Sequence, residues 1–219
     1  KYGYWCKRCS NCVNTSNFDV GNKILELVLT MSEVSDSDVS NAIEAAAKNN
    51  NVAALELLLK YSRASVSFHS AVKVALNNKS DKAAIHLLTH TRVDPAHDNN
   101  FYIRYAAEKG LPDVVKVLLK KDKVNPAVAH NSALRAACVA GDIEVVKTLL
   151  ADTRVNPADF ANHPIQIASL TGHVEIAKLL LADPRVNPSA NNNYPVKIAT
   201  ERGHTAIIEL LTSHPRFKK

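Results

Sequence analysis

Aromatic residues are scarce in this sequence, making up only 5% of its 219 residues. It also lacks any uninterrupted apolar run of about 18 residues, the length that a membrane-spanning helix needs. The stretch from Lys1 to Val20 lacks the apolar segment of a secretory signal. We therefore expect no membrane span and no large aromatic core. Many small aliphatic contacts between helices fit this composition better.

Charge of one sign is not concentrated anywhere in the chain. Lys and Arg number 27 against 21 Asp and Glu, a net charge of +6, but no block of five like charges occurs. Nucleic-acid binding by such blocks is therefore not expected. The four cysteines are too few and too unevenly spread for a secreted disulfide framework. The composition favours an intracellular protein of the cytoplasm or the nucleus.

Self-similarity is the strongest signal in the sequence. An Asp-Pro or Asn-Pro dipeptide recurs at four positions spaced 31 residues apart, beginning at Asp94, Asn125, Asn156 and Asn187. A valine precedes each dipeptide, and an asparagine, an aliphatic residue, an alanine and a glycine follow at fixed offsets. The asparagines are Asn100, Asn131, Asn162 and Asn193, and the glycines are Gly110, Gly141, Gly172 and Gly203. Such a repeated pattern indicates an array of similar structural units.

Each unit reads as two short helices and a connecting loop. In the unit at 155–185, apolar residues at helical spacing predict a first helix that ends at Gly172. We expect Asn162 to cap the first backbone amides of that helix, and Gly172 to adopt a left-handed conformation. A second helix follows, and the segment 183–188, with its two prolines, leaves it as a loop or finger. One such hairpin cannot bury its own apolar face, so neighbouring units must stack.

The helices of this unit carry a family motif. Ile165 to His173 reads I-x-x-A-x-x-x-G-H, and Glu175 to Leu181 reads E-I-A-K-L-L-L. Together they resemble the L-H-x-A-x-x-x-G-H-x-x-V-V-x-L-L-L signature of ankyrin repeats. The sequence departs from the family signature in two ways. Its period of 31 residues is shorter than the usual value of about 33. Its first helix starts with His163-Pro164-Ile165-Gln166 in place of Thr-Pro-Leu-His. The resemblance implies an all-α solenoid of about six stacked helical hairpins with short fingers.

Three parts of the chain follow from this register. Residues 1–20 form a Cys-rich N-terminal segment, residues 21–34 a capping helix, and residues 35–219 the repeat array. The units of the array are expected at about 35–61, 62–92, 93–123, 124–154, 155–185 and 186–216.

The resemblance also implies where a partner binds. Ankyrin repeats grip other proteins on a concave face, formed by the finger tips and the exposed side of the first helices. Aromatic and arginine anchors with polar surroundings are typical of such interfaces. Carried over by register, the expected partner-binding residues are Phe101, His130, Phe160, His163, Leu170, Tyr194 and Arg202. The alternative is that the aromatic residues pack between adjacent fingers.

No arrangement of residues indicates an enzyme or a small-molecule substrate. His173 and His204 occupy the Gly-His turn, where the resemblance implies a structural hydrogen bond between repeats. Cys138 shares its repeat position with small residues, so we expect it to pack and not to act as a nucleophile. The prediction is a monomeric protein-interaction module with a scaffold or adaptor role, without a catalytic site or a required cofactor.

Cys6, Cys9 and Cys12 are the exception to this picture. Two Cys-x-x-Cys steps bring thiolates together as a structural zinc site requires, although a closed tetrahedral site needs a fourth ligand. An inert tail and redox pairing are the other interpretations. Zinc binding would make the repeats the targeting arm of a larger protein with an N-terminal zinc-binding module, for example one like a ubiquitin ligase.

Overall fold

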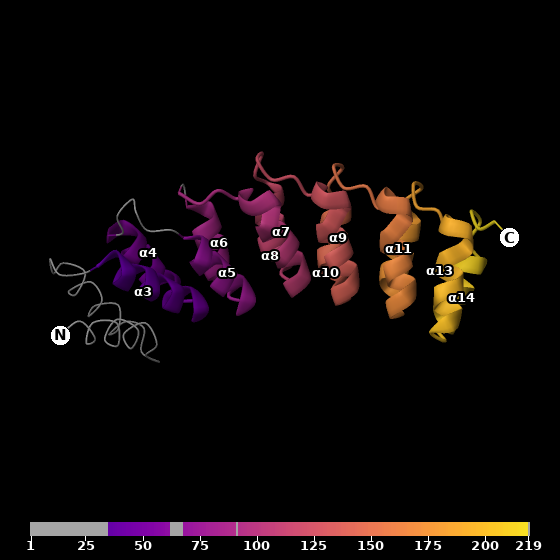
Figure 1. Ribbon diagram of the computed structural model, residues 1–219, viewed down its shortest axis with the longest axis horizontal. Coiled ribbons are helices and arrows are strands. Elements are labelled where there is room, and N and C mark those ends of the chain that lie inside the picture. Colours follow the sequence, from indigo (N-terminus) through magenta and orange to yellow (C-terminus); the bar gives the residue numbers. More distant parts are fainter. Residues whose placement is uncertain (1–34, 62–67, 91, 219) are drawn as a thin grey trace. The chain divides into compact units, whose positions relative to one another are not determined.

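The computed structural model of the chain describes residues 35–61, 68–90 and 92–218 (Figure 1). The Cys-rich segment and the capping helix predicted within 1–34 lie outside the described residues. Over the described ranges every regular element is a helix and no strand is present. The predicted all-α fold of stacked hairpins is confirmed. The chain divides into two compact units, Lys1–Asp94 and Pro95–Lys219.

The first unit contains two described hairpins. Their helices are α3 (Asp36–Lys48), α4 (Val52–Tyr61), α5 (His69–Asn77) and α6 (Asp81–Thr89). First helix packs on first helix, α3 against α5, and second helix on second helix, α4 against α6. Asn50 links the two hairpins, because its side-chain oxygen accepts from the backbone N–H of Ala83 at 2.8 Å, near the beginning of α6.

The second unit contains four hairpins in the same arrangement (Figure 1). The first helices are α7 (His97–Lys109), α9 (Val128–Ala140), α11 (Asp159–Thr171) and α13 (Ala190–Glu201). The second helices are α8 (Pro112–Leu119), α10 (Ile143–Leu150), α12 (Val174–Ala182) and α14 (Thr205–Thr212). Each first helix contacts the next first helix, and each second helix the next second helix. The unit therefore has two layers, a row of first helices and a row of second helices.

Residues at equivalent repeat positions form the core of the second unit. The alanine of each first helix is fully buried and lets neighbouring helices approach closely: Ala106, Ala137, Ala168 and Ala199. The valine before each Asn-Pro dipeptide is also buried and fixes the finger to the hairpins: Val124, Val155 and Val186. The 31-residue pattern is thus a pattern of burial.

The turn glycines leave space for a side chain of the following repeat. Gly172 has φ +78°, as predicted, and a Cβ atom there would lie 2.8 Å from the ring of His204. A Cβ atom on Gly141 would lie 2.7 Å from the ring of His173. The Nε2 of His204 is 3.2 Å from the carbonyl oxygen of Leu170, so the predicted hydrogen bond between repeats is confirmed at this turn.

The predicted capping role of Asn162 is wrong. Residues 160–162 form a left-handed turn, with φ values of 49°, 57° and 60°, before the right-handed part of α11. The side-chain oxygen of Asn162 accepts from the backbone N–H of Asn187 in the next finger at 2.7 Å. Asn100 and Asn131 do the same for Asn125 and Asn156, at 2.8 Å and 3.2 Å. At these three positions the repeated asparagine therefore joins a hairpin to the next finger. The local pattern could not show this, because the partner lies 25 residues away.

A second link between repeats comes from a basic residue that the motif analysis did not single out. Its positions are Arg92, Lys123, Arg154, Arg185 and Arg216. The guanidinium of Arg154 donates to the carbonyl oxygens of Leu119 and Val124, each at 2.9 Å. Leu119 is the last residue of α8, and a cation at a helix C-terminus stabilises it by about 0.3–1 kcal/mol. The arginine thus holds the end of the preceding second helix and the finger that follows it.

Candidate protein-binding face

Exposed apolar side chains are concentrated on the row of first helices in the second unit. Among the described residues, five large apolar side chains are exposed: Val139 (61%), Ile143 (36%), Phe160 (52%), Leu170 (39%) and Tyr194 (43%). All except Ile143 belong to α9, α11 and α13. We call the exposed side of α7, α9, α11 and α13, with their left-handed turns, the first-helix face.

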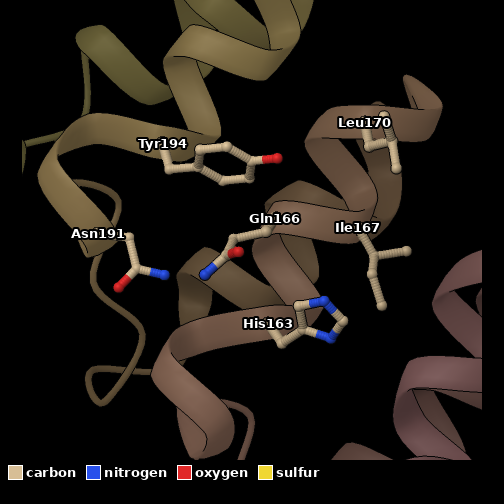
Figure 2. Close-up of a pocket in the computed structure, with 6 residues that line it drawn as sticks. All are labelled: His163, Gln166, Ile167, Leu170, Asn191 and Tyr194. Atoms are coloured by element: carbon tan, nitrogen blue, oxygen red, sulfur yellow. The ribbon is translucent and has the colours of Figure 1, made fainter.

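A pocket of about 270 Å³ opens on this face between α11 and α13 (Figure 2). Its lining residues are His163, Gln166, Ile167, Leu170, Asn191 and Tyr194. His163, Ile167 and Leu170 follow one another at i, i+4 and i+7, and therefore lie on one side of α11. Figure 2 shows the ring of Tyr194 extending from α13 toward α11. The pocket brings together three of the predicted binding residues, His163, Leu170 and Tyr194.

Polar groups at the pocket are fixed by local contacts. The Gln166 side chain is nearly buried, and its Nε2 donates to the carbonyl oxygen of Ala161 at 2.7 Å. Burial lowers the pKa of His163, and the positive charge of Arg135 lowers it further. The imidazole of His163 is therefore neutral at pH 7. Its Nδ1 is buried and has no hydrogen-bond partner among the described residues.

An aromatic cluster adjoins the pocket around Phe160. The ring of Phe160 stacks on His130 of the preceding repeat, with centroids 5.2 Å apart, and meets His163 edge-on at 5.4 Å. The guanidinium carbon of Arg135 lies 5.2 Å from the centroid of the same ring. Packing between adjacent repeats therefore accounts for part of the Phe160 surface, but half of the residue stays exposed.

The remaining predicted residues lie apart from the pocket. Phe101 is half-buried and stacks on Tyr105 of the same helix, with centroids 5.0 Å apart. Arg202 is exposed and follows the last residue of α13. Neither residue lines the pocket.

Two pocket residues, Gln166 and Ile167, were missed by the sequence analysis. A signal existed for Ile167, which lies one helical turn after His163. The repeat register did place Asn191 and Val139 on the predicted face, at the positions equivalent to Phe160 and Leu170. Asn191 lines the pocket, and Val139 is the most exposed large apolar residue described.

Groups with reactive potential elsewhere are accounted for by packing. Cys138 is fully buried, and burial raises the pKa of its thiol to about 12. Its predicted packing role is confirmed. In the described ranges no group of three His, Cys, Asp or Glu side chains is placed to hold a metal ion. Cys6, Cys9 and Cys12 lie outside those ranges, so zinc binding there stays a prediction. No described helix has both the length and the apolar character needed to cross a bilayer.

Stacked hairpins with an exposed apolar strip on one helical row define a helical-repeat protein. A family model for ankyrin repeats in three copies matches residues 68–159 and again residues 136–219. The two matches together cover more than half of the chain, which therefore belongs to the ankyrin-repeat family. No curated protein matches the sequence. Repeats of this family are generally protein–protein interaction modules.

Proposed function

We propose that this chain binds a partner protein through the first-helix face of its second unit, in a scaffold or adaptor role. The observation that carries the proposal is the position of the exposed large apolar side chains: of the five in the described part of the chain, four lie on α9, α11 and α13. Clustered apolar groups on a soluble protein mark interaction surfaces. The finger and turn contacts hold this face in one arrangement before a partner arrives, which lowers the ordering cost of binding.

The backbone at Phe160 supports the same role. Its φ of 49° is left-handed, a conformation that costs a residue with a side chain roughly 1–2 kcal/mol. The equivalent positions hold Asp98, Ala129 and Asn191, so the turn does not require an aromatic residue. A half-exposed aromatic ring at a backbone position that does not require one fits a contact surface for a partner.

Affinity capture with a matched control tests the proposal. The bait is the full chain, compared with Phe160→Ala/Tyr194→Ala and with Ile143→Ala, whose exposed side chain lies on α10. Each bait is first checked for folding by circular dichroism, and the lysate is treated with nuclease. We expect quantitative mass spectrometry to find a protein that the parent and Ile143→Ala retain and the double variant loses. Equal capture by all three baits would place the interaction elsewhere on the chain.

A further inference from the structure

One side-chain position on the first-helix face is cationic in three of the four repeats. The residues are Arg104, Arg135, Gln166 and Lys197, each 31 residues after the one before. We call this set the basic row. Because consecutive first helices pack against each other, these positions are neighbours across the row of helices.

The cations of the basic row have no internal counter-charge. Among the described residues, no carboxylate lies within 4.0 Å of Arg104, Arg135 or Lys197. The lysines of the second helices in the second unit behave differently, since each pairs with an acid three residues earlier. The pairs are Lys116 with Asp113 (3.1 Å), Lys147 with Glu144 (2.8 Å) and Lys178 with Glu175 (2.7 Å). The second-helix row is thus neutralised within itself, whereas the basic row is not.

The two arginines are also held in place. Arg104 donates to the carbonyl oxygen of Asp98 and Arg135 to that of Ala129, each at 3.2 Å. A guanidinium has five N–H donors, so one bond to a carbonyl leaves further donors for a carboxylate. These side chains are therefore oriented before a ligand arrives.

We infer that the partner contributes an extended acidic segment, with carboxylates on the basic row and one large apolar side chain in the pocket beside Tyr194. This inference rests on the proposed function and names the chemistry of the partner. Neighbouring helices pack about 8–10 Å apart. A chain extended in the polyproline II conformation rises about 3.1 Å per residue with three residues per turn, so its side chains at i, i+3 and i+9 point the same way. One helix along the row therefore corresponds to about three residues of the partner. The matching segment has carboxylates at about its first, fourth and tenth residues and an apolar side chain at about its eighth.

A protein segment fits this face better than a nucleic acid does. The acids of the first helices lie on either side of the basic row, Asp98 and Asp159 near the helix beginnings and Glu108 and Glu201 near the ends. A phosphate backbone would present uniform negative charge to these groups as well as to the cations. A peptide can place its carboxylates only where the cations are, and its apolar side chain against Ile167 and Leu170.

Fluorescence anisotropy with the full chain tests the inference. The labelled probe is the peptide Asp-Ser-Gly-Asp-Ser-Gly-Ser-Leu-Ser-Asp, compared with a scrambled peptide of the same composition and with single-stranded DNA. The test variant is Arg135→Gln/Lys197→Gln, which is compatible with the fold because Gln166 occupies this position natively and bonds the same turn. The control is Lys147→Gln/Lys178→Gln, which removes equal charge from the second helices.

We expect saturable binding of the designed peptide. The test variant should bind it roughly 2- to 30-fold more weakly, which is the loss that two exposed ion pairs produce. The control variant should bind it as the parent does. Equal weakening by both variants, equal binding of the scrambled peptide, tighter binding of the DNA or no saturable binding would each overturn the inference. The capture experiment separates the two proposals. A partner lost by Phe160→Ala/Tyr194→Ala but retained by Arg135→Gln/Lys197→Gln would support the proposed function and refute the acidic segment.

Discussion

Replacing Asn131 with alanine removes a link between two repeats without touching the apolar core. Its side-chain oxygen accepts from the backbone N–H of Asn156 at 3.2 Å, and its Nδ2 donates to the Asp159 carboxylate at 3.0 Å. Asn131 is buried and has a φ of 55°. Each lost hydrogen bond costs about 1 kcal/mol, and alanine tolerates the left-handed region less well than asparagine does. We expect Asn131→Ala to lower the free energy of unfolding by about 2–3 kcal/mol.

The matched control for this prediction is Asn192→Ala. Asn192 also has a left-handed backbone, with φ 56°, but it is exposed, and the equivalent residue of the preceding repeat is Ala161. Alanine meets the same left-handed backbone here as at Asn131, but no side-chain hydrogen bond to a described residue is lost, so we expect a cost of about 1 kcal/mol or less. Urea unfolding followed by far-ultraviolet circular dichroism measures both variants, and hydrogen exchange at the Asn156 amide reports the broken bond directly. A loss for Asn131→Ala no larger than that of the control, with unchanged exchange at Asn156, would refute the linking role.

Four further predictions follow from burial, backbone conformation, titration and metal chemistry. Leu149 is fully buried, so Leu149→Ala is expected to lower the free energy of unfolding by roughly 2–5 kcal/mol. A loss below about 0.5 kcal/mol in urea unfolding, the size of a surface effect, would contradict its core position. Lys79 has a left-handed backbone, φ 54°, at the position where later repeats have glycine. Lys79→Gly should therefore stabilise the first unit by about 0.5–1 kcal/mol in the same assay. A loss of stability would argue against backbone strain at Lys79. Burial, and then the charge of Arg216, lowers the pKa of His214, so protonation of this residue favours the unfolded chain. The contribution of His214 to stability should therefore be full above about pH 6.5 and decline below it. The variant His214→Asp, which copies Asp183 of the preceding repeat, should reduce the difference in unfolding free energy between pH 7.5 and 5.5. If the three N-terminal cysteines hold structural zinc, the purified chain should contain one zinc per molecule by elemental analysis and lose it on their replacement by serine; purified protein without zinc would leave the tail as ordinary thiols.

The sequence by itself predicted the elements that depend on neighbours along the chain. The helix that ends at Gly172, the second helix after it and the stacking of hairpins all follow from residues within one 31-residue unit. The same pattern placed Phe160, His163, Leu170 and Tyr194 on the face where the exposed apolar side chains are found.

The tertiary structure decided the contacts between units of the repeat. Asn162 was expected to cap its own helix, but its oxygen reaches Asn187, and the guanidinium of Arg154 reaches Leu119, 35 residues earlier. The pocket likewise needs side chains from two helices, with Gln166 on α11 facing Tyr194 on α13. A local pattern determines which side of a helix is apolar, because helical spacing fixes that side. It does not determine which polar group of the next repeat comes within hydrogen-bonding distance, because that depends on how the hairpins stack.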